Sequence, residues 1–123
     1  MKICRISFDE TRQYHKNAKK EHVSFANPKN ALWFGIYDNG ILVSFYCLVI
    51  KGKSARFKSN YTVEFYRRRG CLQEFIEHAK SICRQNNVHS MTCFCTKMSY
   101  GSHIRHGALL ISAKKTYYVK YSI

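Results

Sequence analysis

One stretch near the middle of the chain, Val63 to Asn86, constrains the fold more than any other. It reads VEFYRRRGCLQEFIEHAKSICRQN: an apolar strand end, three arginines, a glycine and then an amphipathic helix. A chain that passes from a strand through a glycine turn directly into a helix leaves backbone N–H groups unpaired at the positive end of the helix dipole. With the charge of the arginines added, the stretch predicts an anion site.

The segments on both sides of this turn predict a strand–helix–strand unit. Apolar residues recur with helical spacing over Cys71–Asn86, which indicates one amphipathic helix. Alternation over Ala55–Phe65 predicts the preceding strand, and its interruption at Ser59-Asn60 indicates a bulge. Val88–Thr96 (VHSMTCFCT) predicts the following strand. Because a helix connects the two strands, we expect them to run parallel.

The remaining segments complete one α/β domain over residues 1–123. Asp38-Asn39-Gly40 predicts a hairpin, because Asn-Gly tolerates positive φ angles, and Ser7 and Asp9 are candidate helix caps. The order of elements predicts a mixed, mostly antiparallel sheet with helices on both faces. We expect further strands at Lys2–Phe8, Ala31–Tyr37, Ile41–Lys51, Ala108–Ser112 and Thr116–Tyr121, a polar helix over Asp9–His22, and a short helix or loop over Ser99–His106.

The charge of the chain indicates an anionic partner. It has 21 Lys and Arg against 7 Asp and Glu, a net charge of +14. Such an excess concentrates polyanions at a surface, so we expect nucleic acid, first of all DNA, as a partner. The alternative is a generally basic protein with no specific polyanion. No apolar run approaches the roughly 20 residues that span a bilayer. We expect no signal peptide, because MKICRISFDE has no long apolar stretch and no small-residue cleavage site. We therefore expect no membrane partner and a cytoplasmic location, in the host if the chain is viral.

Basic side chains that would contact phosphates fall into separate groups along the sequence. They are Lys16, Lys19 and Lys20 in the first helix, Lys51, Lys53, Arg56 and Lys58 around the second turn, and Lys114, Lys115 and Lys120 in the last hairpin.

The six cysteines favour buried, reduced thiols, because most of them sit in apolar patterns. Cys93 and Cys95 alternate on one face of a predicted strand, and His89, His103 and His106 are the nearest histidines. The spacing Cys-x-Cys is not one of the usual structural zinc spacings. Core packing is therefore the first interpretation, with a Cys/His metal site as the alternative.

The turn itself resembles a motif of the GNAT acyltransferase superfamily, R/Q-x-x-G-x-G/A, which binds the pyrophosphate of acetyl-CoA through backbone N–H groups. The first arginine and the central glycine match, and Leu72 stands where Gly or Ala is usual. The resemblance covers nearly the whole chain and implies a GNAT-like fold with acetyl-CoA as cofactor. The residues that it implies for cofactor binding are Val63, Phe65, Arg67, Arg68, Arg69, Gly70, Cys71 and Leu72.

Acyl transfer to an amine needs a base and a proton donor, and three residues are candidates for these roles. Glu64 at the end of the strand would act as the base, and Tyr100 or His103 would protonate the leaving thiolate. Gly107-Ala108 stands where the family often has Gly-Phe, and His103 stands at the position of the family's tyrosine. The alternatives are that Glu64 pairs with an adjacent arginine and that His103 is a surface or capping residue.

Small size, basic charge and many aromatic residues also make the chain similar to phage Mom-like DNA-modification proteins. That resemblance implies modification of adenine in DNA, with acetyl-CoA and iron, and His22 and Ser99-Tyr100 are residues that it would use. Three functions remain open. They are an acyl-CoA-dependent acyltransferase acting on nucleic acid or a nucleic-acid-associated target, a non-catalytic nucleic-acid-binding accessory protein, and acetylation of a small amine, which the net positive charge disfavours.

Overall fold

Two long apolar strands, β2 (Ala31–Asp38) and β3 (Ile41–Lys51), form the hairpin predicted around Asn39 and Gly40. Both turn residues have positive φ angles, 50° and 77°, which an Asn-Gly pair adopts at low cost. Residues Leu42 to Leu48 of β3 are buried without interruption. β3 is therefore covered on both faces, as its unbroken apolar sequence predicts.

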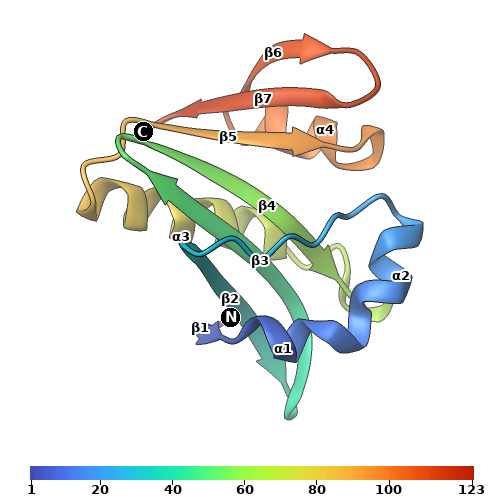
Figure 1. The fold of residues 1–123 in the computed structure, drawn as a ribbon. Coiled ribbons are helices and arrows are strands. Elements are labelled where there is room, and N and C mark those ends of the chain that lie inside the picture. Colours follow the sequence, from blue (N-terminus) through green and yellow to red (C-terminus); the bar gives the residue numbers. More distant parts are fainter.

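In the computed structural model, which describes all 123 residues, seven strands form one sheet in the order β1-β2-β3-β4-β5-β7-β6 (Figure 1). The other strands are β1 (Ile3–Ile6), β4 (Ser54–Thr62), β5 (Ser90–Cys95), β6 (Leu109–Ala113) and β7 (Tyr117–Ser122). Only β4 and β5 pair in parallel, and every other pair is antiparallel. The predicted fold class and the predicted parallel crossover are both confirmed.

Helices cover both faces of the sheet. On one face lie α1 (Phe8–Thr11) and α2 (His15–Lys20), joined by the 3-10 turn Arg12–Tyr14; the ring of Tyr14 stacks on Phe45. On the other face α3 (Cys71–Gln85) packs Phe75 against Tyr46. The helix α4 (Lys97–Arg105) covers β5 and β7. Because Phe45 and Tyr46 are neighbours in β3, they point to opposite faces, and a core of 27 buried apolar residues extends over both.

β4 and β5 pair over only three residues and then separate. The pairs are Ser54–Ser90, Ala55–Met91 and Arg56–Thr92. β4 stays paired with β3 as far as Thr62, so its β5-facing edge from Phe57 onward has no strand partner. Figure 1 shows the two strands diverging toward their carboxyl ends.

A bulge in β4 accompanies this separation. Tyr61 pairs with Phe45 and Lys58 with Cys47, so Ser59 and Asn60 together oppose one residue of β3. Ser59 has a φ of 55°, and its hydroxyl donates a hydrogen bond to the Ser24 carbonyl at 2.6 Å. A bulge bends its strand and increases the local twist. The interruption predicted at Ser59-Asn60 is confirmed, and it turns the end of β4 away from β5.

Several predicted boundaries need correction. The polar helix predicted over Asp9–His22 is two short helices interrupted by a 3-10 turn, and it begins after Ser7, whose N–H donates to the Glu10 carboxylate at 2.6 Å. The strand predicted as far as Phe65 ends at Thr62, and Glu64–Tyr66 is a 3-10 turn. Of the short helix or loop predicted over Ser99–His106, Ser99 to Arg105 belong to the helix Lys97–Arg105 and His106 follows its end. No helix combines the length and the apolar character that crossing a bilayer requires.

Candidate active site at the open end of the sheet

The turn between β4 and α3 presents a row of unpaired backbone donors. Arg68 and Gly70 have φ angles of 64° and 84°, so the chain winds tightly before the helix begins. The first helical bond runs from the Glu74 N–H to the Gly70 carbonyl at 3.1 Å. The six N–H groups from Arg68 to Gln73 have no acceptor in the chain. The free donors predicted from the sequence are therefore present. Successive free N–H groups at a helix N-terminus are suited to bind an anion, and the anion itself stays a prediction.

A cavity of about 330 Å³ lies against this turn. Leu72 stands where the motif has a small residue. Its side chain is half-buried, packs against the core and also lines the cavity. The larger side chain is therefore accommodated at the interface between helix and sheet. Across the cavity, α4 and the residue after it contribute Ser102, Arg105 and His106. The side chains of Arg68 and Arg105 are exposed at its wall. The cavity therefore combines free backbone donors with positive charge.

Arg67 is held away from a cofactor role by its side-chain partners. Its Nη2 donates to both carboxylate oxygens of Glu21, at 2.8 and 2.7 Å, and its Nε donates to the Thr62 carbonyl at 2.9 Å. The Glu21 carboxylate raises the pKa of this guanidinium. The prediction that Arg67 binds the cofactor is corrected accordingly: its N–H donates to the Glu64 carbonyl at 3.3 Å, and its side chain fixes the turn against the end of α2. Phe65, with 66% of its surface exposed, lies outside the strand to which it was assigned.

A second cavity, of about 390 Å³, lies on the opposite face of the sheet at the end of β4. Its lining combines α2 residues with the end of β4: Tyr14, Asn17, Lys20, Glu21, Tyr61, Val63 and Glu64. Glu64 is exposed and forms no ion pair, because Arg67 takes Glu21 as its partner. The alternative in which Glu64 pairs with an adjacent arginine is therefore wrong. Val63 is buried and forms part of the wall.

The two candidates for proton donation have different surroundings. His103 is 2% exposed, and its ring nitrogens contact the Tyr121 hydroxyl at 2.7 Å and the Cys93 thiol at 3.8 Å. His103 is therefore not a surface residue, and its ring is not free to reach the thiolate of a cofactor. Its interpretation as a proton donor and its interpretation as a surface or capping residue are both corrected. Tyr100 is half-buried on α4, and its ring stacks on Tyr117 at 4.4 Å. Tyr100 remains the candidate acid.

The basic residues predicted to bind nucleic acid do not form one surface. Lys16, Lys19 and Lys20 are exposed on α2, and Lys20 borders the second cavity. Lys51, Lys53 and Arg56 are exposed at the opposite end of β4. Lys58 is half-buried and donates to the Ala26 carbonyl at 2.7 Å, and burial lowers its pKa. Its assignment to phosphate contact is corrected.

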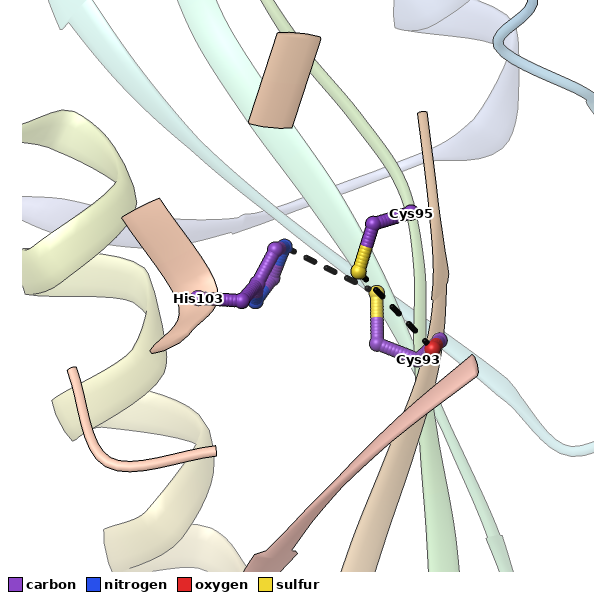
Figure 2. A group of neighbouring side chains, drawn as sticks. All are labelled: Cys93, Cys95 and His103. Atoms are coloured by element: carbon purple, nitrogen blue, oxygen red, sulfur yellow. Dashed lines mark hydrogen bonds between the residues drawn. The ribbon is translucent and has the colours of Figure 1, made fainter. Parts of the chain in front are cut away.

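One group of metal-ligating side chains lies beside the site. Cys93 and Cys95 of β5 face His103 of α4, and their ligand atoms lie within 4.8 Å of one another (Figure 2). From the sequence, core packing is the first interpretation of these cysteines and a Cys/His metal site is the alternative, with His103 as one of the three nearest histidines along the chain. Two thiols and one imidazole are not the two-histidine, one-carboxylate set of non-haem iron enzymes, so the iron expected from the Mom-like resemblance does not fit here.

Comparison with known proteins identifies the fold. No protein-family model and no curated protein matches the sequence. Among solved structures, an acetyltransferase of the GNAT family from Staphylococcus aureus is 8% identical with a TM-score of 0.80, and the match covers 98% of each chain. An aminoglycoside 6'-N-acetyltransferase complexed with coenzyme A is 6% identical with a TM-score of 0.82, over 99% of this chain and 97% of that one.

A third similar structure is PaiA N-acetyltransferase from Thermoplasma acidophilum in complex with coenzyme A. It is 12% identical with a TM-score of 0.72, and the match covers 94% of this chain and 68% of that one. The chain therefore has the fold of the GNAT N-acetyltransferases.

Proposed function

We propose that this protein is an acyl-CoA-dependent N-acyltransferase of the GNAT type. The observation that carries the proposal is the row of six unpaired N–H groups from Arg68 to Gln73 beside a cavity bordered by arginines. A pyrophosphate satisfies several such donors at once and is attracted by the helix dipole. Solved structures of the same fold that contain coenzyme A support this ligand over an unrelated anion.

Two cavities lie near the end of β4, where this strand no longer pairs with β5. One cavity borders the turn on the α3 face, and the other lies beside α2. Bound acyl-CoA supplies an acyl group activated as a thioester. Glu64 accepts the proton that the attacking amine loses, and Tyr100 donates a proton to the thiolate that departs. The unpaired edge of β4 offers backbone donors for the developing oxyanion.

The acceptor amine would enter the α2 cavity. Lys16, Lys19 and Lys20 are exposed on this helix, and the whole chain is strongly basic. This arrangement supports an acceptor that belongs to nucleic acid or to a nucleic-acid-associated protein, because phosphate contacts would position it beside the cavity. The same lysines support the second candidate function, nucleic-acid binding without catalysis.

Isothermal titration with acetyl-CoA and with acetyl-pantetheine, which lacks the phosphates, tests the proposal. We expect acetyl-CoA to bind and acetyl-pantetheine to bind at least about tenfold more weakly, since each lost charge-assisted contact is worth about 1.5 kcal/mol or more. Arg68→Ala combined with Arg105→Ala should weaken acetyl-CoA binding. The matched control, Lys51→Ala combined with Lys53→Ala, removes the same charge at the far end of β4 and should not.

Two results would overturn the assignment. Absence of acetyl-CoA binding at high micromolar concentration, together with salt-sensitive DNA binding, would favour the non-catalytic function. Equal loss of affinity in both double variants would show that only net charge matters and that the turn is not the phosphate site.

A further inference from the structure

We propose that Cys93, Cys95 and His103 form a binding site for one Zn²⁺ ion between β5 and α4. The three side chains are buried, and their ligand atoms all lie within 4.8 Å of one another (Figure 2). Around tetrahedral zinc, with bonds of about 2.0–2.3 Å, ligand atoms are separated by about 3.5–3.8 Å. The 3.8 Å between the Cys93 Sγ and the His103 Nε2 already matches this separation. No pair of ligand atoms is more than 4.8 Å apart, so closing the site requires a shortening of about 1 Å at most.

The ligands are positioned by regular secondary structure. Cys93 and Cys95 are two residues apart in β5, so their side chains point to the same face of the sheet. β5 is fixed along these residues by its pairing with β7. His103 is near the end of α4, which packs on this face. The site therefore rests on a strand and a helix and needs no loop to fold around the ion.

Tyr121 selects the tautomer that a metal requires. Its hydroxyl lies 2.7 Å from the His103 Nδ1 and 3.4 Å from the His103 carbonyl oxygen. When the hydroxyl donates to the carbonyl, its oxygen accepts the Nδ1 proton, and the unprotonated Nε2 faces the thiols. A metal-bound histidine almost always has such a partner on its second nitrogen. Tyr121 is thus a positioning residue for the site.

Charge balance suits a buried zinc ion at this position. Binding converts two thiols to thiolates and releases two protons, so the ion, the thiolates and the neutral imidazole sum to zero charge. A neutral complex avoids the large cost of burying an uncompensated charge. Thiolate and imidazole are the usual zinc ligands, and three protein ligands leave the fourth position open to a small molecule.

Zinc at this position would attach α4 to the sheet. The same helix and the residue after it provide Ser102, Arg105 and His106 to the wall of the phosphate cavity. Metal binding would therefore stabilise one wall of the proposed acyl-CoA site. The inference does not depend on acyltransferase activity, and its test uses no acyl-CoA.

The test is a cobalt titration of the full, reduced, metal-free chain, because thiolate-bound Co²⁺ gives an intense charge-transfer band that Zn²⁺ then bleaches. We expect one ion per chain and release of two protons. Cys93→Ser and Cys95→Ser should abolish the band, and Tyr121→Phe should weaken affinity about 10–100-fold. Cys83→Ala, which removes a buried thiol of α3, is the matched control and should retain the band.

A second measurement uses only the wild-type chain, so that the test does not depend on whether the variants fold. Alkylation of the wild-type chain with and without Zn²⁺, followed by peptide mass spectrometry, should show protection of Cys93 and Cys95 beyond that of the other four cysteines. Absence of the charge-transfer band in the wild type, or metal-dependent protection confined to other cysteines, would overturn the proposal and leave a hydrogen-bonded core cluster. Retention of the band in both serine variants would overturn it equally.

Discussion

A single nitrogen of Arg67, Nη2, lies 2.8 and 2.7 Å from the two carboxylate oxygens of Glu21, 46 residues earlier in the chain. Glu21 caps the end of α2 and lines the α2 cavity, while Arg67 begins the turn that leads into α3. The ion pair thus links the two faces of the sheet at the place where β4 ends. Its side chains are 31% and 29% exposed, so solvent screens it only in part.

We expect Glu21→Gln to lower the free energy of unfolding by about 1–2 kcal/mol, because hydrogen bonds to charged groups contribute more than neutral ones. Urea unfolding of Glu21→Gln, Arg67→Gln and the double variant forms a double-mutant cycle. A coupling energy near zero would show that the pair contributes nothing. Asp9→Asn is the control, because its pair with Arg12 is exposed and should contribute little.

Glu64→Gln should lower kcat for acyl transfer about 10²–10⁴-fold and leave the affinity for acetyl-CoA unchanged, because the carboxylate acts on the amine and not on the cofactor. Release of free CoA in the presence of an acceptor amine measures the rate. Glu77→Gln, on the outer face of α3, is the matched control. If both variants keep full activity, Glu64 is not the base.

Substitutions at Ser59 should separate backbone strain from hydrogen bonding. Ser59→Gly relieves the positive φ and loses one hydrogen bond, so we expect a change of at most about 1 kcal/mol. Ser59→Val loses the same bond and places a β-branched residue at φ 55°, which should cost at least about 2 kcal/mol more. Urea unfolding measures both, and Ser112→Val in the exposed strand β6 is the control. Equal stabilities of the two Ser59 variants would contradict the bulge geometry.

Stability should fall as the pH drops below about 6.5, the pKa of an unperturbed histidine. Burial lowers the pKa of His78, whose Nδ1 contacts the Tyr46 hydroxyl at 2.7 Å, and burial also lowers the pKa of His15. Because the unfolded chain takes up these protons first, the free energy of unfolding is highest above the unfolded pKa and declines through the interval down to the folded pKa.

Urea unfolding at pH 8 and pH 5 checks this dependence. We expect His78→Gln to lose less stability than the wild type between the two pH values, while His89→Gln, at an exposed position, behaves as the wild type does. An unchanged pH dependence in His78→Gln would exclude His78 as a contributor.

The order of elements, the hairpin at Asn39-Gly40 and the bulge in β4 could be predicted because each depends on a local pattern. Strand alternation, helical spacing and turn residues each depend on a few neighbouring residues in the sequence. All of these local preferences agree with the packing of the core. The free N–H groups at Gly70 follow from the same local logic, since a helix that begins directly after a glycine turn has no partners for its first donors.

Contacts between distant residues could not be predicted in this way. Nothing near Arg67 in the sequence indicates that Glu21 is its partner, so the sequence predicts an arginine that is available to a phosphate. A lone histidine near a helix end is typical of a surface or capping residue, yet Tyr121 and Cys93 contact both ring nitrogens of His103 and make its burial favourable. Lys58 was misassigned for the same reason, because the Ala26 carbonyl that it contacts comes from the loop between α2 and β2, more than 30 residues earlier in the chain.

The short parallel ladder has a mechanical consequence. The pairs Ser54–Ser90, Ala55–Met91 and Arg56–Thr92 are the only strand pairing between strands β1 to β4 and strands β5, β7 and β6. A rocking motion about this ladder would change the distance between the carboxyl ends of β4 and β5. The strands on each side of the ladder would keep their own hydrogen bonds. In native-state hydrogen exchange, the amides of these three pairs would then exchange faster than those of β3. This difference would be seen even if thermal unfolding is a single transition.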